Sequence, residues 1–190
     1  MQKITEVRWH GRGGQGTVTA AKIFAETAIS GGNHVQAFPE YGPERMGAPL
    51  RAYNRVSATP LSLHCQVTNP KIVVVVDNTL FGTVDVTEGT PEDAIYVINS
   101  PDDPKTIRKN YRITNGSIYT VDATRISLET LGRPIPNTPM LGALAKVTDV
   151  ISKENLIADT KTNLSKKLSE EVVQKNLEAI NRAYEEVKSE

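Results

Sequence analysis

The chain has 190 residues, and its 22 lysines and arginines balance its 22 aspartates and glutamates, so the formal net charge is zero. A chain of this length suits one domain that buries about 70% of its unfolded surface, and a neutral balance lacks the basic footprint that nucleic-acid binding needs. The single cysteine excludes an intrachain disulfide and any zinc or iron–sulfur cluster built only on cysteines of this chain.

Apolar runs in the sequence are shorter than the roughly 18 residues that a membrane span needs, and no secretory signal is visible at the N-terminus. We therefore expect a single domain over residues 1–190 that resides in the cytoplasm. Neither nucleic acid nor a membrane is an expected partner.

The first informative stretch is a predicted strand, turn and helix. An apolar, β-prone run over residues 4–9 enters a turn with four glycines, and helical spacing follows over residues 20–30. The series Gly11-x-Gly13-x-x-Gly16 matches the dinucleotide-binding pattern in its required context. Backbone N–H groups at such a helix start favour a phosphate. A purely structural turn is the alternative, because left-handed backbone angles cost a residue with a β-carbon about 1–2 kcal/mol.

A proline-rich loop follows the second predicted strand, residues 34–38. Three prolines and two glycines between residues 39 and 49 exclude a regular element, and the loop also carries Tyr41, Glu44, Arg45 and Met46. It is either a ligand-binding loop or a solvated surface loop. The strand expected over residues 50–57 follows so closely that it should be an antiparallel neighbour, which predicts a mixed sheet.

Further elements alternate along the chain. We expect a short edge strand at residues 61–65 with Cys65 as a small buried side chain, and Asp77 as a cap after a central strand buried on both faces. The remaining strands are expected at residues 72–76, 94–99 and 117–122, with helices at 104–109 and 123–131. Asn137 can cap a later helix, in which Gly142 indicates close packing against another backbone.

The chain is predicted to be helical from residue 152 to its end, with a longer helix from residue 169. The predicted fold class is therefore α/β: a three-layer α/β/α arrangement around a mixed, mostly parallel sheet. It begins with a Rossmann-like βαβ unit and ends with C-terminal helices that pack on the same domain.

Three stretches together resemble one family. Residues 11–22, 38–49 and 137–143 are similar to the gamma subunits of 2-oxoacid:ferredoxin oxidoreductases, most of all to that of pyruvate:ferredoxin oxidoreductase, also called pyruvate synthase. The similarity covers nearly the whole chain in order, and the loop at residues 41–49 is its most specific part. Met46 departs from the family pattern, in which a second basic residue is common.

The resemblance implies a role within a larger enzyme, and no catalysis by this chain alone. The family enzyme converts pyruvate, coenzyme A and oxidised ferredoxin into acetyl-CoA, CO2 and reduced ferredoxin. Thiamine diphosphate, Mg and 4Fe-4S clusters belong to partner subunits, namely the alpha, beta (thiamine) and delta (ferredoxin-type) chains. The gamma subunit is implied to bind no cofactor alone, and to contribute to assembly and to a shared coenzyme A pocket.

The same resemblance implies the site residues. A phosphate of coenzyme A would lie at the glycine turn, Arg45 and Arg133 would pair with its anionic groups, and Glu44 would orient Arg45. Asn137 would either contact the ligand or cap its helix. The full set of implied site residues is Gly13, Gly14, Gln15, Gly16, Thr17, Glu44, Arg45, Met46, Arg133 and Asn137.

Three other hypotheses remain open from the sequence. A stand-alone NAD-binding dehydrogenase would use Gly11, Gly13 and Gly16, with Glu40 near the position of the ribose-binding acid. A gamma subunit of an enzyme for another 2-oxoacid, such as 2-oxoglutarate or a branched-chain acid, would show the same motifs. In a purely structural subunit, the glycine turn would pack against a partner.

Overall fold

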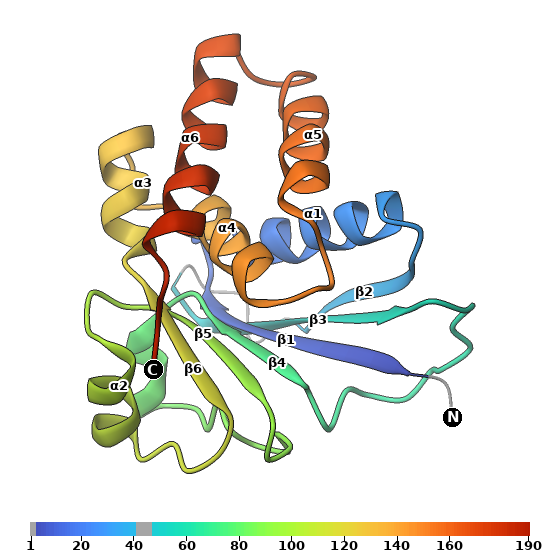
Figure 1. Ribbon diagram of the computed structural model, residues 1–190, viewed down its shortest axis with the longest axis vertical. Helices are drawn as coiled ribbons and strands as arrows, with labels where there is room; N and C mark the ends of the chain where they lie inside the picture. Colours follow the sequence, from blue (N-terminus) through green and yellow to red (C-terminus); the bar gives the residue numbers. More distant parts are fainter. Residues whose placement is uncertain (1–2, 41–46) are drawn as a thin grey trace.

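The computed structural model describes residues 3–40 and 47–190, which form one sheet with helices on both faces (Figure 1). The seven strands lie in the order β2-β3-β1-β4-β5-β6-β7. They are β1 (Ile4–Arg12), β2 (His34–Glu40), β3 (Pro49–Ser57), β4 (Ile72–Val75), β5 (Ile95–Asn99), β6 (Ser117–Val121) and β7 (Lys188–Ser189). The helices are α1 (Thr17–Ser30), α2 (Pro104–Tyr111), α3 (Ala123–Leu131), α4 (Asn137–Val147), α5 (Lys153–Leu164) and α6 (Glu170–Glu186), with a 3-10 turn, η1, at Asn78–Gly82.

The sheet is mixed and mostly parallel in strand direction, as predicted. β1, β4, β5 and β6 pair in parallel, while β3 pairs antiparallel with both β1 and β2, so that β2 runs in the direction of β1. Only β3 and β7 run the opposite way among the described strands. The first βαβ unit is therefore split, because β3 lies between its two strands.

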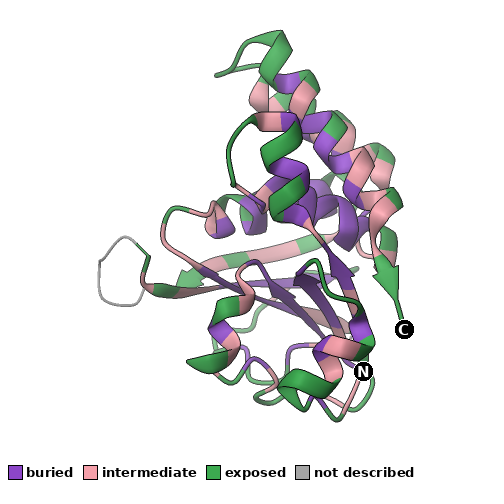
Figure 2. Ribbon diagram, turned by 90° about the vertical axis from the view of Figure 1, so that its left-hand side faces the viewer, coloured by how far each residue is buried: buried purple, intermediate pink, exposed green. Residues whose placement is uncertain are grey.

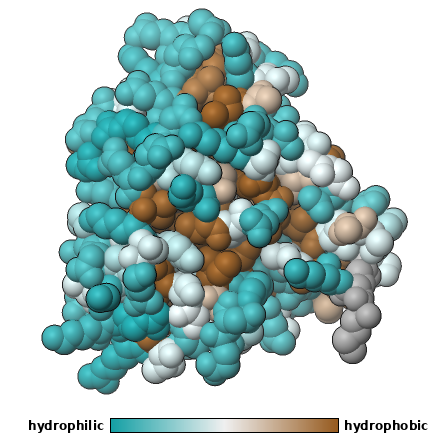
Figure 3. Space-filling model, in the orientation of Figure 1, coloured by the Kyte–Doolittle hydropathy of each residue, from teal (hydrophilic) through white to brown (hydrophobic). Residues whose placement is uncertain are grey.

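Two hydrophobic cores lie on opposite faces of the sheet, and the smaller one lies only over β4, β5 and β6 (Figures 1 and 2). The larger core joins Trp9 and Val74 to α1, α3, α4, α5 and α6, which all lie on one side. The smaller core joins Val75 and Ile98 to Ile107 of α2 on the other side. Figure 3 shows hydrophobic surface in the middle of one face, where the helices meet the sheet, and a smaller hydrophobic patch near the top of the same view.

The central strand β1 is apolar on one face and charged on the other. Val7 and Trp9 belong to the larger core, whereas Arg8 and His10, one residue along, must point to the opposite face of the pleated sheet. Both polar side chains are nevertheless buried, at 3% and 1% exposure. The face of β2, β3 and β1 away from α1 thus holds buried polar groups in place of a hydrophobic layer.

Several sequence predictions fail in detail. Residues 61–65 form no strand, and Cys65 is exposed. The last helix ends at Glu186, and residues 188–189 add the short strand β7 to the edge of the sheet. The prediction for Gly142 is confirmed, because a β-carbon there would lie 3.0 Å from the Ile180 Cα of α6 and closer still to its carbonyl oxygen. No helix in the described part of the chain is both long and apolar enough to cross a membrane.

Candidate functional site

The candidate site lies at the glycine turn, residues 13–16, where β1 ends and α1 begins. Gly11 belongs to β1 and not to the turn. A β-carbon at Gly11 would lie 3.1 Å from Thr17 Cβ and closer to its hydroxyl, so this glycine allows α1 to start against the strand. Gly14 and Gly16 have φ angles of 95° and 75°, which L side chains rarely adopt. The turn therefore needs glycine for its backbone as well as for space.

Free backbone donors gather at this helix start. The first helical hydrogen bond runs from Ala20 N to Gly16 O, and the N–H groups of residues 16–19 make no hydrogen bond within the described residues. The N–H of Gly14 is likewise unpaired there. Unpaired donors and the helix dipole together favour an anion at this position. This geometry suits an anion such as a phosphate group.

A polar cluster of Arg12, Gln15 and Asp77, here called the brace, links the turn to the segment after β4. The side chain of Gln15 accepts from Arg12 N at 2.8 Å and donates to Asp77 Oδ2 at 2.6 Å, and Arg12 forms an ion pair with Asp77 at 3.3 Å. Burial raises the pKa of Asp77, but hydrogen bonds from Thr79 and Gln15 outweigh it and lower the pKa overall. An ionised Asp77 thus ties the turn to the end of β4.

The brace bears on two sequence predictions. Asp77 caps η1 as expected, accepting from Thr79 N, and it also anchors the turn. Both polar ends of the Gln15 side chain are engaged in the brace, so a bond from that side chain to a ligand would have to replace one of these. Arg12, which the sequence analysis did not single out, is fixed here by Thr79 and the Gly47 carbonyl. The sequence signal that could have indicated a role for Arg12 is its position between Gly11 and Gly13 at the end of the first strand.

The proline-rich loop returns to the glycine turn. Gly13 N donates to Ala48 O at 3.1 Å, and Gly47 N donates to Gly13 O at 3.2 Å. The predicted site residues Glu44, Arg45 and Met46 lie outside the described residues. Gly47 and Ala48, near the end of the same loop, are nevertheless hydrogen-bonded to the glycine turn, with which the family resemblance had grouped the loop.

The start of α4 lies against the same turn. A β-carbon on Gly16 would come within 2.6 Å of Asn137 Nδ2, so the Asn137 amide packs directly over the glycine. The predicted cap is not formed, because Pro136 holds the cap position of α4 and no side chain caps it. Asn137 is instead the first residue of the helix, and its amide faces α1. Two helix starts thus meet at one place.

Thr17 and Arg133 take less direct positions. Thr17 is 1% exposed, and its hydroxyl is buried without a partner in the described part of the chain, so only its backbone N–H is free to face a ligand. Arg133 is exposed and precedes α4, and within residues 3–40 and 47–190 its side chain makes no hydrogen bond or ion pair. Within the described residues, Arg133 therefore makes no hydrogen bond or ion pair with the turn.

The dehydrogenase hypothesis does not fit this geometry. A ribose-binding acid must end the strand that neighbours β1, but β3 separates β2 from β1. Glu40, at the end of β2, accepts a hydrogen bond from the Tyr53 hydroxyl at 2.5 Å. Among the described residues, no three His, Cys, Asp or Glu side chains gather as a group that could hold a metal ion.

Comparisons with known proteins agree on one family. The family model described as "Pyruvate ferredoxin/flavodoxin oxidoreductase" matches residues 6–186. A protein named pyruvate synthase subunit PorC from Thermotoga maritima is 46% identical over 98% of this chain and 96% of its own length. The pyruvate/ketoisovalerate oxidoreductases common subunit gamma of Pyrococcus abyssi is 43% identical over 96% of each chain.

Solved structures agree with these matches. The crystal structure of pyruvate oxidoreductase subunit PORC (EC 1.2.7.1) from Thermotoga maritima is similar with a TM-score of 0.86 and 44% identity, covering 99% of both chains. A 2-oxoglutarate:ferredoxin oxidoreductase from Magnetococcus marinus, with 2-oxoglutarate, coenzyme A and succinyl-CoA bound, has a TM-score of 0.75 over 96% of this chain and 31% of that one. At 22% identity the latter match shows a shared fold alone.

Proposed function

The chain belongs to the pyruvate ferredoxin/flavodoxin oxidoreductase family, and on that basis we propose that it is the gamma subunit of a multi-subunit pyruvate:ferredoxin oxidoreductase. The assembled enzyme converts pyruvate, coenzyme A and oxidised ferredoxin into acetyl-CoA, CO2 and reduced ferredoxin. Relatives that carry the name of a pyruvate synthase subunit match nearly the whole chain, which supports this proposal.

The proposed role of this chain is to hold one side of the coenzyme A pocket. One observation supports it above the others: stretches around residues 13–17, 47–48 and 137 meet at the free N–H groups that begin α1. The diphosphate of coenzyme A bears several anionic oxygens, and these N–H donors would bind them by charge-assisted hydrogen bonds. Arg45 and Arg133 are proposed to pair with further anionic groups of the same ligand, and Glu44 to orient Arg45.

The chemistry of carbon–carbon cleavage is assigned to partner chains. We assign thiamine diphosphate, Mg and the 4Fe-4S clusters to the partner subunits, namely alpha, beta (thiamine) and delta (ferredoxin-type), with ferredoxin as the electron acceptor. The single cysteine of this chain agrees with that division, because a cluster needs several thiolates. The acyl acceptor would then enter at a boundary between this chain and the thiamine-binding subunits.

A gamma subunit that serves more than one 2-oxoacid is the second candidate. The Pyrococcus abyssi relative favours it, since its name joins pyruvate and ketoisovalerate oxidoreductases in one common subunit. The two candidates differ in the substrates of the assembled enzyme and share the coenzyme A site.

Native purification tests the proposal. The tagged chain should copurify with thiamine-binding and cluster-binding subunits, and the complex should reduce ferredoxin only when pyruvate and coenzyme A are both present. Activity with 2-oxoisovalerate or 2-oxoglutarate at a similar kcat/KM would favour the second candidate. A chain that purifies without partners and binds NAD more tightly than coenzyme A would refute both.

A further inference from the structure

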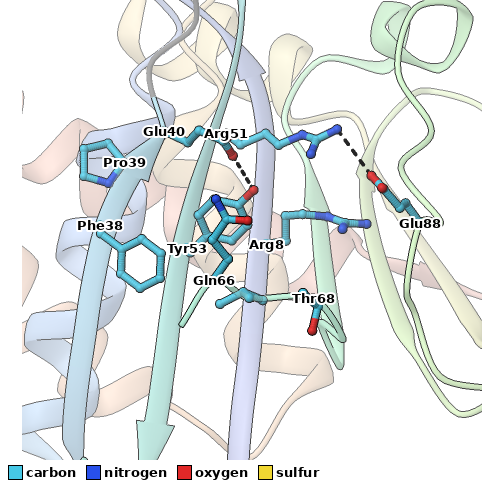
Figure 4. Close-up of a pocket in the computed structure, with 10 residues that line it drawn as sticks. Arg8, Phe38, Pro39, Glu40, Arg51, Tyr53, Gln66, Thr68 and Glu88 are labelled. Carbon is cyan, nitrogen blue, oxygen red and sulfur yellow. Dashed lines mark hydrogen bonds and ion pairs between the residues drawn. The ribbon is translucent and has the colours of Figure 1, made fainter. Parts of the chain in front are cut away.

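A cavity of about 350 Å³ lies on the sheet face away from α1 (Figure 4). That volume is within the range of about 300–1,000 Å³ that is usual for small-molecule pockets. Its lining residues come from three neighbouring strands and two loops: Arg8, Phe38, Pro39, Glu40, Arg51, Tyr53, Gln66, Val67, Thr68 and Glu88. The cavity opens on the flat of the sheet, and not on the glycine turn at the end of β1.

Arg8 is buried in this wall without an acidic partner. It is 3% exposed, its Nε donates to His10 Nε2 at 2.9 Å, and its Nη2 donates to Val86 O at 2.9 Å. No carboxylate in the described part of the chain forms an ion pair with it. Burial lowers the pKa of Arg8 overall, because it outweighs the more distant carboxylates of Glu88 and Asp85, which raise that pKa. Burial and the nearby Arg8 and Arg51 outweigh the effect of Asp85 and lower the pKa of His10 to about 3, so the imidazole is neutral and accepts the hydrogen bond from Arg8 through Nε2.

Arg55 provides a comparison on the same sheet face. It is 1% exposed and forms an ion pair with Glu6 at 2.7 Å, with a further cation–π contact 5.6 Å from the Phe38 ring centroid. Buried charges in proteins are normally paired in this way, because removing an ion from water is costly. Arg8 departs from that rule, and it does so at the wall of a cavity.

A second guanidinium faces the same space. Figure 4 shows the charged ends of Arg8 and Arg51 on the same side of the cavity. Arg51 lies 3.7 Å from Glu88, but that carboxylate is 64% exposed, so water screens the pair and it is weak. The opposite wall is aromatic, since Phe38 and Tyr53 stack with centroids 5.4 Å apart.

We propose that this cavity binds a small organic anion, whose carboxylate or phosphate group lies between the guanidinium groups of Arg8 and Arg51. The flat or apolar body of the ligand packs against the Phe38–Tyr53 wall. The remaining lining consists of Pro39, Gln66, Val67 and Thr68 and of two carboxylates, Glu40, which accepts from the Tyr53 hydroxyl, and Glu88, which pairs with Arg51. A bound anion supplies the negative charge that Arg8 lacks. The described lining of this cavity shares no residue with the glycine turn, residues 13–16, and the existence of the site does not depend on the function proposed above.

The single cysteine allows a local test. Cys65 is exposed and precedes Gln66 of the cavity wall, so a trifluoromethyl label on its thiol reports on the site by ¹⁹F NMR. The labelled full-length chain is titrated with benzoate, phenyl phosphate and neutral benzamide, and calorimetry on the unlabelled chain repeats the measurement. We expect saturable binding of at least one anion and none of benzamide, and the tighter anion identifies the acid group.

Variants locate the binding. Arg8→Met removes the buried charge at similar volume and should weaken binding about 10–100-fold, as expected for the loss of charge-assisted hydrogen bonds. Arg51→Met, which removes a more exposed group, should weaken it less and serves if Arg8→Met does not fold. Lys109→Met, an exposed cation on α2, is the matched control and should bind as the wild type does.

Three results would overturn the proposal. The first is no saturable binding of either anion at millimolar concentration. The second is equal affinity in the Arg8, Arg51 and Lys109 variants. The third is displacement of the bound benzoate or phenyl phosphate by coenzyme A, which would make the cavity part of the coenzyme A site and not a second site.

Discussion

Gly14→Ala is the sharpest test of the proposed phosphate site at the glycine turn, because the chain offers a matched control in Gly32→Ala. The two glycines have φ angles of 95° and 88°, and a β-carbon on either meets no atom within 4 Å. The two substitutions therefore carry the same backbone penalty without a clash. They differ in place: Gly14 lies in the turn before α1, whereas Gly32 follows the other end of that helix.

The expected magnitudes separate strain from ligand binding. Each substitution should cost about 1–2 kcal/mol of folding stability, the usual penalty for a β-carbon in the left-handed region. For a chain of this size that corresponds to a fall in Tm of about 2–8 °C. Gly14→Ala additionally places a methyl group next to the unpaired N–H of residue 14 itself. Losing one charge-assisted hydrogen bond, worth about 1.5–3 kcal/mol, should raise the KM for coenzyme A about 10–150-fold.

The assay is ferredoxin reduction by the assembled enzyme, with coenzyme A and pyruvate varied in turn. Gly14→Ala should raise the KM for coenzyme A and leave the KM for pyruvate near its wild-type value, while Gly32→Ala should change neither. Equal coenzyme A kinetics in the two variants, at similar Tm, would show that the turn does not hold the ligand.

Three further predictions follow from the structure and sequence. Gly142→Ala should lower the free energy of unfolding in urea by about 1–3 kcal/mol, because its methyl group overlaps the Ile180 backbone, although helix propensity alone favours alanine by about 1 kcal/mol. His10→Asn should flatten the fall in stability between pH 6.5 and 4: the unfolded chain protonates this imidazole near its usual pKa, whereas the folded chain does so only at about 3. Arg45→Ala should raise the KM for coenzyme A far more than that for pyruvate in steady-state assays of the complex.

Each of these predictions has its own control. Gly31→Ala, at a glycine with an ordinary φ of −77° and only ordinary contacts, should change stability little. His34→Asn alters an exposed histidine and should keep the wild-type pH dependence. If Gly142→Ala raises the free energy of unfolding, α4 and α6 are not in the tight contact described here. If the stability of His10→Asn depends on pH as that of the wild type does, His10 is not the buried neutral group. Unchanged coenzyme A kinetics in Arg45→Ala would remove that loop from the site.

Much of the site was predictable because its parts are local motifs. The glycine turn, the loop at residues 41–49 and the helix start at Asn137 were each visible as stretches of sequence, and family resemblance joined them. The contacts that individual residues make within these stretches could not be predicted from the sequence. That Gln15 braces Asp77, and that Asn137 covers Gly16 and leaves the helix cap to Pro136, depends on contacts between residues far apart in the chain.

The sequence by itself determined the elements and the faces they present. Once residues 4–12 form a strand, Trp9 and Arg8 must lie on opposite faces, since side chains along a strand alternate whatever lies beside it. The helix at residues 123–131 was predicted to the residue, because Asp122 and Gly132 carry local start and stop signals.

Only the tertiary structure decided which elements became neighbours. No local signal places β3 between β1 and β2, adds β7 to the edge of the sheet or leaves Cys65 exposed, because strand order and burial depend on the free energy of the whole packed chain. The same holds for Arg8. Its charge is plain in the sequence, but its burial beside a cavity, with no ion pair in the described part of the chain, exists only once β1, β3 and the loops around Gln66 and Val86 come together.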